Sequence, residues 1–277
     1  PRRRIAVERR GTVPGGGRMA AYLRATDGAR IAAFEGPGAV APPVFHATWE
    51  TGAALELLTQ VAESIPSFGG VVHLESETVP LRPLRPEDRY RCRVELEGTE
   101  EDPRGVSLRV SARNWNGAEQ LCSEGSARFL VRTREAARAG PKPKGARETG
   151  GAAAAEAEGW AELARWSLGS GAGRRYARAS GDYNPIHLWG WTARPFGFRR
   201  PVLHGYCTEA MVAHALVERL FRGDPTALRR LRIAFRAPLL LPARACLLVR
   251  EAEGRRSFRV SAVDGEKTFA EGEFTGA

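Results

Sequence analysis

The chain has 277 residues, 43% of them apolar, and a formal net charge of +10. This length allows one large domain or two of ordinary size. No run approaches the roughly 18 consecutive apolar residues of a membrane span, so we expect no membrane association. The positive charge favours phosphates or acidic proteins as partners. Zinc-finger, RNA-binding and basic-helix patterns are missing, so we expect no nucleic-acid partner.

The chain begins with a basic, glycine-rich stretch, PRRRIAVERRGTVPGGGRM. It lacks the apolar core of a secretory signal. We expect residues 1–18 to be a flexible basic arm.

Four cysteines are scattered along the chain without CxxC spacing: Cys92, Cys122, Cys207 and Cys246. This pattern argues against a zinc site or a disulfide framework. It is typical of proteins in a reducing compartment, so we expect a cytoplasmic protein.

Two halves of similar size flank residues 134–159, which are rich in Ala, Gly, Pro and charge and read as a linker. The halves, 19–133 and 160–277, resemble each other. PPVFHATWETGAALELL aligns with RPVLHGYCTEAMVAHAL, which places His46 and His204 158 residues apart. Later segments, such as SLRVSAR and SFRVSAV, match in the same order. We infer a duplicated unit.

Each unit follows one plan. Apolar residues recur at three-to-four spacing in 52–62 and 210–220, which predicts a long amphipathic helix in each half. Alternating apolar and polar runs follow each helix and predict antiparallel strands joined by short turns. These strands are expected at 91–96 and 106–110, and at 245–249 and 258–263. A long helix covering one face of an antiparallel sheet makes an α+β unit.

The segment YARASGDYNPIH places an acid, an amide and an imidazole within six residues, as Asp182, Asn184 and His187. Gly181 gives the backbone freedom to turn. Pro185 has no N–H and suits a turn or the first position of a helix. We therefore expect the carboxylate and the imidazole to converge on one point.

Gly205 lies at the start of the second long helix, in the segment GFRRPVLHG. Free N–H groups and the helix dipole at that end suit developing negative charge. Packing of the helix against the sheet would also explain a glycine. His204 has a counterpart in the half that lacks the acid–imidazole motif, so a structural role is favoured for it. Nothing orients Cys207 with His204 as a nucleophile would need.

The order of these motifs resembles the MaoC-like dehydratase family, which is similar to (R)-specific enoyl-CoA hydratases. The resemblance covers the 36 residues from Tyr176 to Met211 and includes SGDxNPIH, Ala-Arg, Gly-Phe and HG in order. It implies a hot-dog fold, a long helix wrapped by a curved antiparallel sheet. The duplicated chain is then a tandem (double) hot-dog. The first half has no NPIH and is expected to be a degenerate copy without an active site.

The resemblance implies (3R)-specific hydration of trans-2-enoyl thioesters, or the reverse dehydration of (3R)-3-hydroxyacyl thioesters, in fatty-acid or related acyl metabolism. Asp182 and His187 would share one water as a catalytic dyad. Asn184 would hold the loop or orient the water. The Gly205 N–H would stabilise charge on the thioester oxygen.

No metal or other cofactor is expected, and the substrate would arrive as a thioester of CoA or of acyl carrier protein. Candidate substrate-binding residues are Arg194, Phe196, Phe198, Arg199 and Arg200. The arginines could face the carrier's phosphates or remain solvated. The phenylalanines, with Trp189 and Trp191, could line an acyl tunnel or pack in a core or interface.

Two alternatives stay open. Hot-dog thioesterases usually use a carboxylate on the long helix, and Glu209 is the nearest candidate here. A non-catalytic acyl-carrier or nucleic-acid binding module would use the net charge as its main asset. A double hot-dog chain could act alone or pair again as a homodimer.

Overall fold

The computed structural model describes residues 5–62, 68–138 and 159–277. Most of the expected linker, residues 139–158, lies outside the described residues. Its first residues form helix α3 (Arg134–Arg138), which continues directly from the last strand of the first half.

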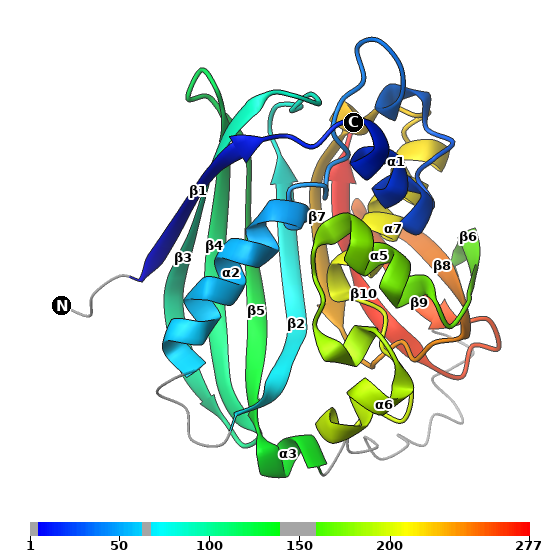
Figure 1. Ribbon diagram of the computed structural model, residues 1–277. Coiled ribbons are helices and arrows are strands. Elements are labelled where there is room, and N and C mark those ends of the chain that lie inside the picture. Colours follow the sequence, from blue (N-terminus) through cyan, green and yellow to red (C-terminus); the bar gives the residue numbers. More distant parts are fainter. Residues whose placement is uncertain (1–4, 63–67, 139–158) are drawn as a thin grey trace.

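One antiparallel sheet runs through both halves (Figure 1). Within the described residues it has ten strands, in the order β1-β3-β4-β5-β2-β7-β10-β9-β8-β6. The strands of the first half are β1 (Ala6–Thr12), β2 (Phe68–Pro80), β3 (Arg89–Asp102), β4 (Gly105–Asn116) and β5 (Leu121–Thr133). Those of the second half are β6 (Ala161–Leu168), β7 (Leu228–Phe235), β8 (Ala243–Ala252), β9 (Arg255–Ala262) and β10 (Thr268–Gly276).

The strand order reads the same from both edges. From its outer edge inward, each half contributes its first, third, fourth, fifth and second strand along the chain. The two second strands, β2 and β7, join antiparallel at the centre, where Ser76 lies opposite Ile233 and Thr78 opposite Leu231. Two copies of one unit related by a two-fold axis give this order. The duplication and the α+β architecture predicted from the sequence are therefore confirmed.

Helices cover one side of the sheet (Figure 1). The α-helices are α1 (Gly16–Ala25), α2 (Ala47–Ala62), α5 (Ala172–Ser180), α6 (Gly190–Ala193) and α7 (Gly205–Arg219). Short 3-10 turns are η1 (Ala32–Phe34), η2 (Pro185–His187), η3 (Arg194–Phe196) and η4 (Pro225–Ala227). No helix in the described parts of the chain combines the length and apolar character needed to cross a bilayer.

The helix α7 differs from the expected amphipathic helix, because every residue from Cys207 to Val217 is buried. The segment around α1 covers the side of α7 that faces away from the sheet. Cys207 Sγ lies 3.7 Å from Ala25 O, and His214 Nδ1 is hydrogen-bonded to Thr26 O at 3.0 Å. Polar residues in α7 therefore do not mark a solvent-exposed face.

The start of the chain also differs from expectation. The flexible arm expected over residues 1–18 is wrong from residue 6 onward. There β1 pairs with β3, with Val7 opposite Val94, and α1 begins at Gly16. Val7 and Val13 are buried, and these two side chains attach the basic segment to the core. Residues 1–4 lie outside the described residues.

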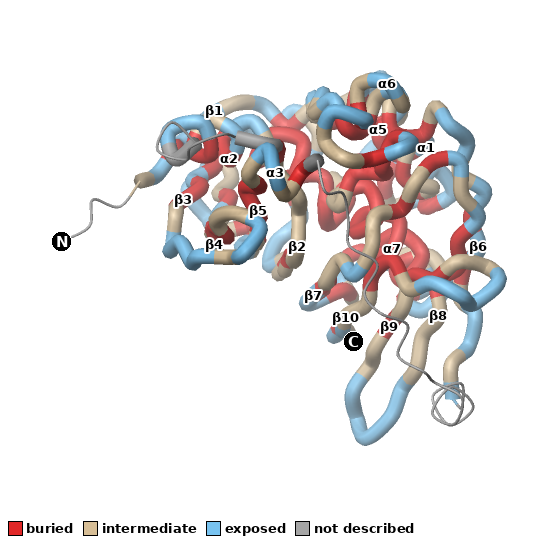
Figure 2. The backbone as a smooth tube through the Cα atoms, turned by 90° about the horizontal axis from the view of Figure 1, so that it is seen from below, coloured by how far each residue is buried: buried red, intermediate tan, exposed pale blue. Residues whose placement is uncertain are grey.

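The largest hydrophobic cluster of the described residues extends through both halves, between the sheet and the helices (Figure 2). It contains β1 and α1 residues of the first half together with residues from the last strand of the second. Tyr22 of α1 packs against Tyr176 of α5, with ring centroids 5.9 Å apart. The two halves therefore form one packed body around the loop that follows α5.

Candidate active site

The loop that carries Asp182 begins at a helix end. Gly181 closes α5 in the left-handed conformation, with φ +86°, and its N–H donates to Ala177 O at 2.8 Å. Only glycine adopts this conformation without steric cost, which is the turn expected from the sequence. The Asp182 N–H then donates to Ser180 Oγ at 3.2 Å.

The next turn brings His187 back toward Asp182. The Asn184 N–H donates to Asp182 Oδ1 at 3.1 Å, and Asn184 Oδ1 accepts from the Ile186 N–H at 3.4 Å. Asn184 therefore caps the short helix η2, and Pro185 occupies its first position as expected. Asn184 holds the loop.

The three side chains of Asp182, His187 and His204 converge. One ligand-type atom from each lies within 4.8 Å of the other two. The imidazoles of His187 and His204 stack with centroids 3.7 Å apart. They are 8% and 1% exposed, while the Asp182 side chain is 23% exposed. The carboxylate thus lies at the solvent edge of a buried pair of imidazoles.

His187 has a defined tautomer. Its Nδ1 lies 2.7 Å from Val202 O, and because a carbonyl can only accept a hydrogen bond, Nδ1 carries the proton. In the neutral ring, Nε2 is then a free base. Burial lowers the pKa of His187, although the Asp182 carboxylate opposes this shift. His187 is therefore a neutral imidazole near pH 7.

The side chain of His204 is hydrogen-bonded to the backbone of Asp182. Its Nε2 donates to Asp182 O at 3.0 Å, and Asp182 Oδ2 lies 4.0 Å away. Burial, together with the neighbouring His187, holds the pKa of His204 well below its usual range. The sequence favoured a structural role for His204. Its side chain bonds the loop of Asp182 and does not cap α7.

Gly205 is the first residue of α7, so its N–H has no acceptor within the helix. A Cβ at this position would lie 2.6 Å from His73 Nδ1 and 3.1 Å from Phe235 Cζ. His73 lies on β2 of the first half, stacked on Phe129 at 4.7 Å. Close packing between the halves therefore requires a glycine here, independently of any hydrogen bond that its N–H donates.

The predicted substrate-binding residues separate into two groups. Phe198 is buried in a small cluster with Ile186 and Val202, and Phe196 packs against that cluster. Both phenylalanines are thus packing residues of the segment between α6 and α7. The three arginines of the set are exposed at the surface: Arg194, Arg199 and Arg200. Trp189 and Trp191 are also exposed and do not line a buried tunnel.

Cys207, which the sequence did not favour as a nucleophile, and Glu209, the thioesterase candidate, are both fully buried. Burial raises the pKa of the Cys207 thiol, which disfavours the reactive thiolate. Glu209 lies on α7 facing β2, where its Oε1 accepts from Thr78 Oγ1 at 2.8 Å. Burial raises the pKa of Glu209 to about 7.

Arg18, which the sequence analysis included in the arm, contacts the loop of Asp182. Its Nε donates to Ala179 O at 2.9 Å, and NH2 lies 3.3 Å from Ser180 O and 3.5 Å from Thr48 O. The guanidinium therefore binds the last carbonyls of α5, where the helix dipole favours a cation. These contacts join segments about 160 positions apart, and no local pattern in the sequence could indicate them.

No corresponding cluster occurs among the described residues of the first half. Asp27 lies near the position matching Asp182, but it accepts from Trp166 Nε1 at 3.1 Å and pairs with Arg30. His46, the counterpart of His204, pairs with Glu50 at 3.0 Å instead.

Among the described residues, Asp182, His187 and His204 are also the group with the spacing needed to hold a metal ion. Two of their ring nitrogens, His187 Nδ1 and His204 Nε2, already bond backbone carbonyls. Each imidazole therefore has one nitrogen left for another partner.

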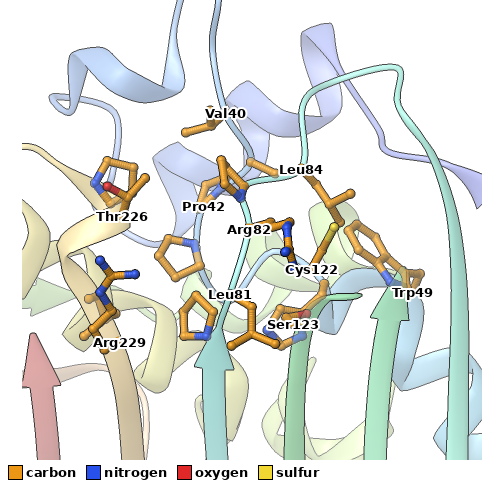
Figure 3. A pocket seen from close by; sticks show the side chains of 17 residues that line it. Val40, Pro42, Trp49, Leu81, Arg82, Leu84, Cys122, Ser123, Thr226 and Arg229 are labelled. Atoms are coloured by element: carbon orange, nitrogen blue, oxygen red, sulfur yellow. The ribbon is translucent and has the colours of Figure 1, made fainter. Parts of the chain in front are cut away.

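A hollow between the two halves lies apart from this cluster (Figure 3). Trp49, Arg82 and Cys122 line one side, and Thr226 and Arg229 the other. Its volume is about 60 Å³, which is room for a few water molecules. None of the predicted site residues lines it.

Comparison with known proteins identifies the second half. Residues 167–272 match the family model described as MaoC like domain. The chain carries a MaoC-like domain. The domain includes Asp182, His187 and Gly205, and the whole chain has a double hot-dog fold.

Proteins similar to this chain include 3-hydroxyacyl-thioester dehydratase X of Mycobacterium tuberculosis. It is 32% identical over 189 residues, which are 67% of this chain and 61% of that protein. The peroxisomal enoyl-CoA hydratase 2 of Arabidopsis thaliana is 46% identical over 52 residues, which are 19% of this chain and 17% of that protein. The chain thus matches less than two thirds of either relative.

The crystal structure of HtdX from Mycobacterium tuberculosis has the same fold as this chain. The TM-score is 0.72 at 22% identity, and the match covers 99% of this chain and 100% of that one. The likeness includes the first half, which the family model does not match.

Proposed function

We propose that this chain catalyses (3R)-specific hydration of trans-2-enoyl thioesters and the reverse dehydration of (3R)-3-hydroxyacyl thioesters. The observation that carries the proposal is the convergence of Asp182 with the neutral imidazole of His187, next to the first residue of α7. The MaoC-like domain and the names of the relatives support it.

In the hydration direction, a water held between Asp182 and His187 loses a proton to the pair as its oxygen bonds C3. The electrons of the C2–C3 double bond move toward the carbonyl and give an enolate of the thioester. C2 then takes a proton from the pair, which returns to its starting state. The net change is the addition of H and OH. Either member of the pair could be the formal base.

The enolate oxygen needs a hydrogen-bond donor, and we assign this role to the Gly205 N–H. It is a free donor at the positive end of the α7 dipole. Such a donor typically contributes about 3 kcal/mol to lowering the barrier.

The proposed chemistry uses no metal and no other cofactor. The substrate would be a thioester of CoA or of acyl carrier protein. We expect the enzyme to work in the cytoplasm, either alone or as a pair of chains.

Hydration of crotonyl-CoA tests the proposal through loss of absorbance at the enoyl band. We expect Asp182→Asn and His187→Ala each to lower kcat by about 10²–10⁴-fold, because each removes one proton-transfer partner. Asp27→Asn, at the matching acid of the first half, is the control and should retain wild-type kcat. Activity should also persist in EDTA.

Equal activity in wild type, Asp182→Asn and His187→Ala would reject the assigned dyad. Dehydration assays with (3R)- and (3S)-3-hydroxybutyryl-CoA test the stereochemistry separately, and turnover of the (3S) isomer alone would reject that part. The burial of Glu209 disfavours the thioesterase alternative. A thiol reagent in the same assay checks it, since hydrolysis would release free CoA without consuming the enoyl group first.

A further inference from the structure

Two tryptophans next to the candidate active site are exposed. Trp189 and Trp191 are 43% and 70% exposed, and their rings stack with centroids 5.9 Å apart at 19°. They lie at the start of α6, two and four residues after His187. Large apolar side chains that are exposed next to each other are typical of a binding surface. We call Trp189 and Trp191 the tryptophan platform.

The chain around the platform is strongly basic. From Ala172 to Leu203 it contains six arginines, no lysine and one carboxylate, that of Asp182. None of these six arginines forms an ion pair within the described ranges. The surface therefore favours a polyanion.

Some of these arginines are adjacent to the platform. The Arg174 guanidinium lies 5.6 Å from the Trp189 ring centroid, held by a 2.8 Å hydrogen bond to Leu188 O. Arg194 follows α6 directly, at the start of η3. The Arg199 backbone oxygen lies 3.5 Å from the position of a Cβ on Gly190, the residue between the two tryptophans. Flat apolar faces and cations thus occur on one surface.

We propose that the tryptophan platform binds the adenosine phosphate end of coenzyme A, with the adenine on the Trp191 ring and the phosphates on Arg174, Arg194 or Arg199. This inference rests on the proposed function and selects CoA, rather than a carrier protein, as the carrier. Bases stack on aromatic side chains through their π faces, and arginine forks match phosphate geometry.

The position of the platform fits the length of the ligand. Trp191 is the fourth residue after His187, so their Cα atoms are at most about 14 Å apart. The long, flexible pantetheine arm of CoA can bridge this separation between thioester and nucleotide. An acidic carrier protein would also meet the arginines, but its docking does not require two parallel indole faces.

Truncated substrates test the inference. We expect Trp191→Ala to raise KM for crotonyl-CoA by roughly tenfold. The same variant should leave KM for crotonyl-pantetheine, which has no nucleotide, unchanged. The value of kcat should stay at the wild-type level with both substrates. Trp191→Phe should keep most of the affinity. If Arg199 holds the 3′-phosphate, Arg199→Gln should raise KM for crotonyl-CoA more than KM for crotonyl-3′-dephospho-CoA.

Trp115→Ala is the matched control, because Trp115 also stacks with an arginine, Arg91 at 3.8 Å, but on the first half. Trp115→Ala should change KM for neither crotonyl-CoA nor crotonyl-pantetheine. An equal change with both substrates for Trp191→Ala, or no change, would overturn the inference. If Trp191→Ala lost affinity for crotonyl-acyl carrier protein alone, the inference would be overturned in favour of protein docking. Conversion of a dimer to a monomer by the same variant would identify a subunit interface instead.

Binding of free CoA separates this inference from the proposed function. We expect CoA to quench tryptophan fluorescence of the wild type and to do so at higher concentration in Trp191→Ala, even if no thioester is turned over. An inactive wild type that binds CoA in this way would reject only the proposed reaction. An active wild type whose CoA binding is unchanged in Trp191→Ala would reject only the platform.

Discussion

Gly205 and His73 meet where the two halves of the chain pack together. Since a Cβ on residue 205 would lie 2.6 Å from His73 Nδ1, we predict that Gly205→Ala lowers the free energy of unfolding by about 1–3 kcal/mol. Adding His73→Ala should relieve the overlap. Urea unfolding of the wild type, both single variants and the double variant measures the coupling, which we expect to be about 1–3 kcal/mol.

Activity in the same four proteins separates packing from chemistry at Gly205. Alanine keeps the backbone N–H, so kcat should recover together with stability in the double variant. A double variant that regains stability but not kcat would mean that the added methyl obstructs the substrate. Packing on His73 would then not be the main reason for a glycine at this position.

Single residues of the site could be predicted where the chain is locally continuous. The spacing in SGDYNPIH and the turn residues Gly181 and Pro185 were enough to predict that Asp182 and His187 converge. The bond from His204 to Asp182 O could not be predicted, because it joins a loop to a helix 22 residues later. A role in the reaction for these residues stays a prediction until it is assayed.

Among the elements of the first half, α1 contacts the loop of the candidate site through Arg18. Arg18 bonds the last carbonyls of α5, two residues before Asp182. We predict that Arg18→Met lowers kcat by roughly ten- to a hundredfold with little change in KM, because misplacing a catalytic group costs rate rather than affinity. Steady-state hydration kinetics, with thermal unfolding as a check of folding, measures this.

Arg24 provides the matched control, since it lies on the same helix and is exposed. Arg24→Met should keep wild-type kcat. Arg18→Lys should recover little, because an ammonium lacks the planar fork that reaches several carbonyls. Added guanidinium ion at non-denaturing concentration should partly restore Arg18→Met. If Arg18→Met and Arg24→Met behave alike, α1 has no influence on the loop of Asp182.

Element prediction succeeded where periodicity is strong and failed where packing decides. The predicted strands lie inside β3, β4 and β8, and the one predicted at 258–263 extends one residue beyond the end of β9. The first long helix was predicted from residue 52 but begins at Ala47, whereas the second begins at Gly205, as predicted. The strand β1 was missed, since Val7 is its one buried residue and its other residues give no apolar alternation. The complete burial of α7 was also missed, because it depends on α1, which comes from the other half.

At the scale of the whole molecule, duplication determines the architecture. The recurring offset of 158 residues predicted two copies, and the sheet order confirms them. The copies have diverged in role. The second half carries Asp182 and His187, while the first supplies Arg18 and His73 as packing and positioning groups around that site. The first half therefore belongs to the site even though it lacks the motif.

Buried histidines of both halves make the stability of the whole chain depend on pH. Burial lowers the pKa of His73 to about 3 and that of His214 to about 4, from 6.5 in the unfolded chain. The folded state then binds fewer protons than the unfolded state between these values. The stability that depends on a neutral buried histidine is fully present above pH 6.5 and is lost as pH falls through the pKa of the folded state. For His214 this loss is on the order of 3 kcal/mol. Glu209, with a pKa of about 7 against 4.5, has the opposite sign and favours the folded state most below pH 4.5.

We predict that the histidines dominate, so that Tm falls as pH decreases from 6.5 to 4. His214→Asn removes one titrating group while its amide can still donate to Thr26 O. The Tm of this variant should therefore fall less between pH 6.5 and pH 4 than that of the wild type. Differential scanning calorimetry at several pH values measures both slopes. Since each buried neutral histidine adds up to one proton to the uptake on unfolding, equal slopes in the two proteins would mean that His214 is not kept neutral by the fold.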